Sequence, residues 1–85
     1  MDKELFCIFD KLAEIYEPPF VEVNRLTAIR RIEDLVTKNP STLYATSSAN
    51  YELVKIGTYD DTGAIILPHP PELILKFGDI TKKDK

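Results

Sequence analysis

The sequence contains very few of the side chains that build catalytic and metal sites. Its 85 residues include one cysteine, one histidine, one methionine and no tryptophan. A single cysteine, Cys7, excludes an intrachain disulfide, whereas small secreted domains usually have several, so we expect a reducing compartment. His69 lies far from Cys7 in the sequence, and we therefore expect no metal site, no cofactor and no catalytic residues. We predict that the protein is not an enzyme.

Glycine and long apolar runs are also scarce. The three glycines, Gly57, Gly63 and Gly78, are too scattered to form a phosphate-binding loop. The apolar run behind the N-terminus covers only residues 5–9, which is too short for a signal-peptide core or a membrane span. We therefore expect no membrane association.

The basic excess that is typical of a duplex-DNA-binding protein is absent as well. There are 11 basic and 14 acidic residues, which gives a net charge of −3. Because affinity for DNA comes largely from neutralising phosphates, this balance argues against a dedicated duplex-DNA binder. Basic residues exceed acidic ones only in residues 24–38 and 76–85, where four basic residues in each segment face two acidic ones.

The first segment, residues 4–23, permits two interpretations from its residues alone. Its apolar residues between Leu5 and Tyr16 follow a helical stripe, with charged residues on the opposite side. The aromatic and β-branched content of Phe6–Phe9 instead favours a strand, followed by a turn and a second short strand. Pro18 and Pro19 end either element, because the residue before a proline avoids the helical region.

The clearest helix covers residues 25–37. Asn24 is placed to cap its N-terminus. Asp34 is spaced to pair with Arg31 and with Lys38 on the polar side. One face is apolar and should pack on a sheet; it consists of Ala28, Ile29, Ile32, Leu35 and Val36.

The C-terminal half predicts a hairpin. Residues 51–59 and 64–67 are expected strands, joined by a turn at Asp60–Gly63 in which Gly63 takes the left-handed conformation. Residues 41–50 are expected to be a surface loop, and Pro68–Pro71 an extended connector. Residues 72–77 form a short final element. We expect a single domain over residues 1–78 and a flexible basic tail over residues 79–85.

Contact with nucleic acid is the one specific binding activity that the residues suggest. Proteins that bind single strands combine a cationic track with aromatic side chains on which bases stack. The candidate binding residues are Arg25, Arg30, Arg31, Lys38, Tyr16 and Phe20. A simpler explanation is a charged, solvated helix, since Glu33 and Asp34 neutralise part of that surface.

The order of several short segments resembles a known family. The segments are the apolar start ending in Phe9-Asp10, then Pro18-Pro19-Phe20, Thr27-Ala28-Ile29-Arg30, Asn39-Pro40-Ser41 and the stretch from Tyr51 to Gly63. Together they resemble the small non-structural protein of gokushovirus-type microviruses, which are single-stranded-DNA bacteriophages. The loop at residues 47–50 and the tail after Leu67 depart from the family's pattern.

The resemblance implies a role in phage genome replication, in the switch to single-stranded DNA synthesis or in packaging, within the host cytoplasm. It implies contact with single-stranded DNA or with a phage replication or packaging protein, and it transfers no catalytic residue. Relatives of this kind look like a strand, a turn and a strand at the N-terminus, which favours the hairpin interpretation of residues 4–23.

We therefore predict a small α+β domain with an N-terminal β-hairpin, one amphipathic helix, a C-terminal β-hairpin and a short final element. Apolar residues Phe6, Ile8, Val54 and Ile56 suggest a second sheet face that needs cover, so a homodimer is expected. The first hypothesis is an accessory replication protein that binds single-stranded DNA weakly. The alternative is an adaptor that binds a phage or host protein without contacting DNA.

Overall fold

The computed structural model describes residues 2–83, and their side chains through residue 80. The strands are β1 (Asp2–Asp10), β2 (Ile15–Tyr16), β3 (Phe20–Glu22), β4 (Tyr51–Asp60) and β5 (Ile65–Lys76). The helices are α1 (Arg25–Thr37), α2 (Leu43–Thr46), the short 3₁₀ helix η1 (Ser48–Asn50) and α3 (Phe77–Lys83). The predicted α+β fold, with strands at both ends and an amphipathic helix between them, is confirmed.

The N-terminal segment is a strand and a hairpin, and the helical alternative is excluded. β1 pairs antiparallel with β4 along its whole length and with β2 and β3 on its other side. Residues 5–8 are all buried, which a strand in the middle of a sheet achieves and a helix with one apolar face does not. The Asp10 carboxylate accepts hydrogen bonds from the amides of Leu12 and Ala13, and this stabilises the turn into β2.

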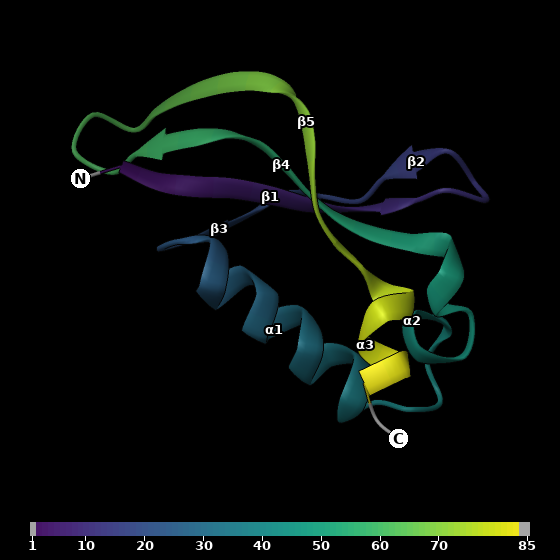
Figure 1. Cartoon of the computed structure of the whole chain (residues 1–85). Coiled ribbons are helices and arrows are strands. Elements are labelled where there is room, and N and C mark those ends of the chain that lie inside the picture. The colour runs from purple at the N-terminus through teal and green to yellow at the C-terminus, as the bar shows by residue number, and fades with distance from the viewer. Residues whose placement is uncertain (1, 84–85) are drawn as a thin grey trace.

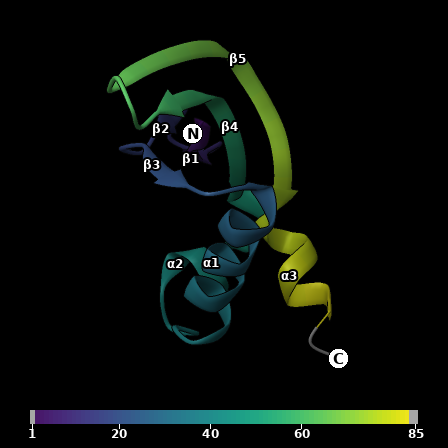
Figure 2. The same ribbon diagram turned by 90° about the vertical axis from the view of Figure 1, so that its left-hand side faces the viewer.

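The five strands form one antiparallel sheet in the order β2-β1-β4-β5, with β3 also paired to β1. All three α-helices lie on the same side of this sheet in both views of the chain (Figures 1 and 2). β5 arches around the outside of β4 before it descends to α3 (Figure 2). No helix within residues 2–83 is long and apolar enough to cross a membrane.

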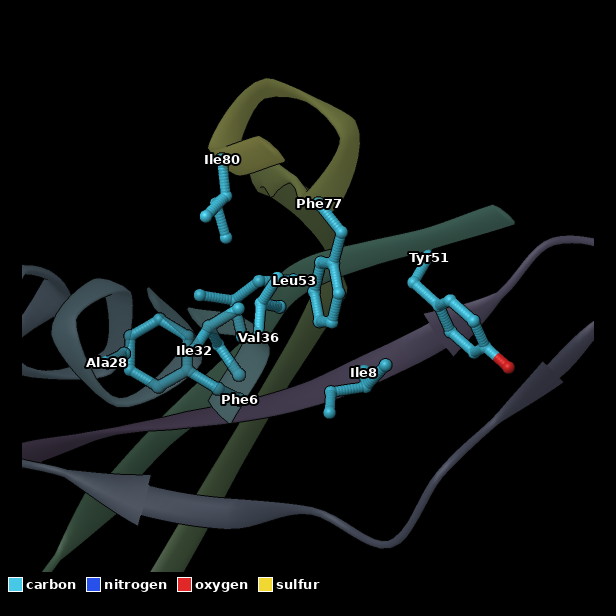
Figure 3. Packing of buried hydrophobic residues seen from close by; sticks show 9 residues of the cluster. All are labelled: Phe6, Ile8, Ala28, Ile32, Val36, Tyr51, Leu53, Phe77 and Ile80. Atoms are coloured by element: carbon cyan, nitrogen blue, oxygen red, sulfur yellow. The ribbon is translucent and has the colours of Figure 1, made fainter. Parts of the chain in front are cut away.

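The core lies between the sheet and the helices (Figure 3). It consists of Phe6, Ile8, Ala28, Ile32, Val36, Tyr51, Leu53, Phe77 and Ile80. The apolar face predicted for α1 is confirmed, since Ala28, Ile32 and Val36 are buried and Ile29 and Leu35 pack against this cluster. Asn24 caps the helix as expected, accepting from the Thr27 amide at 2.9 Å.

The second sheet face differs from its prediction. Phe6 and Ile8 belong to the core beneath the helices. The face without helices is centred instead on Leu5, Cys7 and Val54, because successive side chains of β1 alternate and Cys7 lies opposite Val54. These three side chains are buried between their neighbours on a curved sheet, although no helix among the described residues covers them.

The C-terminal half contains more regular structure than predicted. Residues 43–50 form α2 and η1 rather than a loop. The Pro68–Pro71 connector is part of β5, whose outer edge tolerates prolines because no strand within residues 2–83 pairs with it there. In the turn, Ala64 and not Gly63 takes the left-handed conformation, with φ 56°.

The expected tail also needs correction. The boundary predicted after residue 78 falls inside α3, which runs through Lys83, and Ile80 is only 3% exposed within the core. Asp79 in its first turn favours the helix electrostatically. Residues 84–85 of the predicted tail lie outside the described residues.

Replacing Ile80 with Ala tests whether α3 is part of the core. We expect Ile80→Ala to lower the free energy of unfolding by about 2–5 kcal/mol, because it leaves a cavity among large side chains. Urea unfolding measures this change. The control is Leu26→Ala on α1. The Leu26 side chain is 74% exposed, so its loss should change the free energy of unfolding by less than about 0.5 kcal/mol. Equal and small effects would mean that residues 79–83 do not contribute to the core.

Candidate functional site

A groove of about 540 Å³ lies between the segment that precedes β3 and the C-terminal half of α1. One wall is formed by residues 17–20 and the other by α1 and the two residues that follow its end. The groove is lined by Ile8, Glu17, Pro18, Pro19, Phe20, Arg31, Ile32, Asp34, Leu35, Lys38 and Asn39. Its volume is within the range of pockets that bind small molecules or single side chains of a partner.

The proline wall is held in place at Glu17. The Glu17 amide donates to the carbonyl of Ile8 at 2.8 Å, which ties the segment to β1. The Tyr44 hydroxyl donates to Glu17 Oε1 at 2.7 Å, which ties the same residue to α2. Two prolines follow directly, and their fixed φ angles keep this wall stiff. The wall is therefore preorganised.

One end of the groove is formed by Arg31 and Phe20. The Arg31 guanidinium lies 4.2 Å from the centre of the Phe20 ring and donates to Glu22 Oε2 at 3.0 Å. The Phe20 ring also stacks on the buried ring of Phe6 at 6.1 Å. A cation thus already lies over the Phe20 ring, and a base that stacks there has to displace Arg31.

The other end of the groove is also neutralised. Lys38 pairs with Asp34 at 3.7 Å, one turn back on the same helix. The Asn39 side-chain amide donates to the carbonyl of Leu35 at 3.0 Å, which closes the end of α1. The rim therefore has two cations and two carboxylates around an apolar floor of Ile8 and Ile32.

Three of the six sequence-predicted candidates meet at the groove, and three do not. Phe20, Arg31 and Lys38 line it. Arg25 lies at the opposite end of α1, bound to Glu72 of β5 at 2.8 Å. Arg30 is exposed on α1 with no ion pair among the described side chains. Tyr16 lies on β2 and stacks on Phe9 at 4.4 Å, on the sheet face away from the helices.

Sequence reasoning missed most of the groove's apolar wall and the contact that fixes it. Pro18 and Pro19 were identifiable only as residues that end an element, and nothing in their neighbourhood indicates that α1 lies across from them. Tyr44 and Glu17 are separated by 26 intervening residues, so their hydrogen bond has no local signal. Asn39 was visible as part of a helix stop and not as a groove residue.

The lining of the groove has the composition of a binding site. An apolar floor with a few convergent polar groups recognises a side chain or a small apolar group. Among the described residues, no cluster of three or more His, Cys, Asp or Glu side chains is placed to hold a metal ion. Burial raises the pKa of the Cys7 thiol, with a smaller contribution from Glu17, so this cysteine is a poor nucleophile.

A comparison with protein families gives one match, to the family described as phage ORF5 protein, over residues 3–80. The chain belongs to this family. No curated protein and no solved structure matches it. All residues that line the groove lie between Ile8 and Asn39. The groove therefore lies entirely within the part of the chain that matches the phage ORF5 family.

The Tyr44–Glu17 contact makes the wall of this phage ORF5 protein sensitive to alkali. Burial, followed by the hydrogen bond to Glu17, raises the pKa of Tyr44 from 10.0 to about 12. The folded chain favours the protonated phenol of Tyr44. The contribution of this tyrosine to the free energy of unfolding is therefore complete below pH 10 and is lost as the pH rises towards 12.

We expect the ultraviolet absorbance of tyrosinate to show a late ionisation near pH 12 whose amplitude falls in Tyr44→Phe. Tyr16→Phe, which changes an exposed tyrosine, is the control and should retain this step. Burial also raises the pKa of Tyr51, so the comparison is of amplitudes. If Tyr44→Phe, like Tyr16→Phe, leaves the absorbance change near pH 12 at its full size, the hydrogen bond that fixes the groove wall is not formed in solution.

Proposed function

We propose that this phage-family protein is a non-enzymatic accessory factor that acts by binding another protein through the groove between residues 17–20 and α1. Its partner is a replication or packaging protein of the phage, in the host cytoplasm. The place in replication or packaging rests on the resemblance to microvirus non-structural proteins. The mode of action rests on the groove.

The observation that carries this proposal is the pairing of the helix cations. Of the four basic residues predicted to form a phosphate track, Arg25, Arg31 and Lys38 are bound to carboxylates, and two of these pairs join different elements. A phosphate backbone would have to compete with these carboxylates on a chain of net charge −3. A peptide segment, in contrast, meets an apolar floor and both signs of charge.

The groove supports a partner segment with one apolar or aromatic anchor side chain. Such anchors in desolvated pockets supply most of the energy of protein interfaces, and the polar rim excludes water around them. The floor residues Ile8 and Ile32 are buried in the core, and the proline wall is fixed by Glu17, so little order has to be gained on binding.

Weak binding of single-stranded DNA is the second candidate. The observation in its favour is that Phe20, Arg31 and Lys38 are gathered around one groove. Against it, Tyr16 lies on the other sheet face and Arg25 lies at the far end of α1. One short segment of single-stranded DNA could therefore not contact all six candidate residues.

The test titrates the labelled full chain with each purified replication and packaging protein of the same phage. We expect one of them to bind, and Lys38→Glu and Leu35→Ala each to weaken that binding at least about tenfold, which corresponds to about 1.4 kcal/mol. Urea unfolding of both variants confirms that they remain folded.

The matched control is Arg30→Glu, which makes the same charge change as Lys38→Glu on the same helix but away from the groove. It should change the affinity by less than about threefold. Absence of binding by every such phage protein, or equal weakening by Arg30→Glu and Lys38→Glu, would contradict the proposal.

A further inference from the structure

The outer edge of β5 is an unpaired strand edge with apolar side chains. β5 ends the strand order of the sheet, so one row of its backbone groups has no neighbouring strand among the described residues. At its start, Ile65, Ile66 and Leu67 are 52%, 54% and 61% exposed. Open apolar edges are rare in monomeric proteins because they pair readily with other strands.

The position of these residues leaves them without cover on either face. Alternation along the strand places Ile65 and Leu67 on one side and Ile66 on the other. The hairpin of β4 and β5 extends past the start of α1, so the helical layer does not reach its tip (Figure 1). The radius of gyration, 13.2 Å, exceeds the about 12 Å of a compact domain of this length, which agrees with a projecting hairpin.

Prolines limit how much of the edge can pair. Pro68, Pro70 and Pro71 have no amide hydrogen, so the second half of β5 cannot continue a ladder of hydrogen bonds. Only the stretch from Ala64 to Pro68 remains, and it contains no charged residue. The edge is therefore short, apolar and sharply bounded at one end.

We propose that this edge binds the same edge of a second copy of the chain, in antiparallel register about a twofold axis that passes beside Ile66. Each Ile65 then lies opposite Leu67 of the other copy, so apolar side chains meet on both faces. The pairing uses the one free β5 edge of each copy, which closes the assembly at two chains. This inference is independent of the groove.

The register of the apolar side chains selects this arrangement. A twofold axis perpendicular to the sheet pairs only residues of equal parity. Centring it on Ile65 would bring Gly63 opposite Leu67, and centring it on Leu67 would bring Pro68 opposite Ile66 and His69 opposite Ile65. Both alternatives lose the pairing of Ile65 with Leu67. With the axis at Ile66, Asp61 lies opposite Pro71 of the other copy, and Asp60 lies opposite Glu72, whose charge is neutralised by Arg25.

The size of the contact predicts a weak dimer. Three partly exposed side chains per copy bury well under the about 800 Å² per partner of a standard interface. We therefore expect a dissociation constant of roughly 10–500 μM, so the chain is monomeric when dilute and dimeric when concentrated.

Sedimentation equilibrium of the full chain, from about 5 μM to about 1 mM, brackets this range and tests the proposal. We expect the wild-type mass to rise from one chain to two, and Ile66→Lys to remain monomeric throughout because it places a charge at the axis. Leu43→Lys is the matched control, since Leu43 is 64% exposed on α2 and distant from β5, and it should dimerise like the wild type. Circular dichroism checks that both variants are folded.

A second measurement tests the register. Ile66→Cys should form a covalent dimer with a short bis-maleimide, because residues opposite each other on paired strands have Cβ atoms about 5 Å apart. Leu43→Cys should not, and the native Cys7 is buried. A wild-type chain that stays monomeric, a dimer that Ile66→Lys leaves intact, or growth beyond two chains would each overturn the proposal.

Discussion

The burial of β1 on both of its faces is the constraint on which the other elements depend. Within Leu5–Ile8, Phe6 and Ile8 point to the helices while Leu5 and Cys7 point to the other face, and all four are buried. A strand with two apolar faces has to lie in the interior of a sheet. β4 therefore pairs along one side of β1, β2 and β3 share the other side, and α1 covers Phe6. The segment from Glu17 to Phe20 is held against α1 by this arrangement, and the groove is its consequence.

Ion pairs reduce the positive charge that α1 and the residue after it present to solvent. Exposed pairs contribute little stability, commonly below about 1 kcal/mol each. They nevertheless neutralise Arg25, Arg31 and Lys38. Cations outside α1 are also paired, since Lys55 of β4 binds Glu4 and Lys11, in the turn after β1, binds Glu52. The surface is electrically balanced over short distances, which suits recognition of a protein more than recognition of a polyanion.

Much of the fold was predictable from local pattern, and the errors have common physical causes. The helix with its Asn24 cap and the C-terminal hairpin follow from side-chain periodicity and turn chemistry. The helical stripe of residues 5–16 was misleading, because its apolar residues do not share one environment. Residues 5–8 are buried in the middle of the sheet, whereas Leu12, Ile15 and Tyr16 are exposed. The prolines of β5 suggested a connector, although they are compatible with a strand whose outer edge is free. Ile80 was predicted to lie in a tail because burial by distant elements leaves no local signal.

The candidate site was less predictable than the fold. Phe20, Arg31 and Lys38 were identified as binding residues by type, and they do share a groove. Arg31 is paired with Glu22 and Lys38 with Asp34, and these carboxylates compete with any anion that approaches the two cations. For Arg31 the expected partner was Asp34 on the same helix, whereas the structure pairs it with Glu22 of the neighbouring strand. Only the tertiary structure decides between these carboxylates.

The central claim is that three of the four basic residues in and beside α1 are bound to carboxylates, so that they do not form a track for phosphates. The most direct measurement is the fluorescence anisotropy of a labelled single-stranded oligonucleotide titrated with the full chain at low and at high salt. The account predicts no binding at low salt up to about 100 μM protein, the weak end of ordinary non-specific affinity. Micromolar binding that weakens steeply with salt would contradict it and would make this chain a single-stranded-DNA-binding protein.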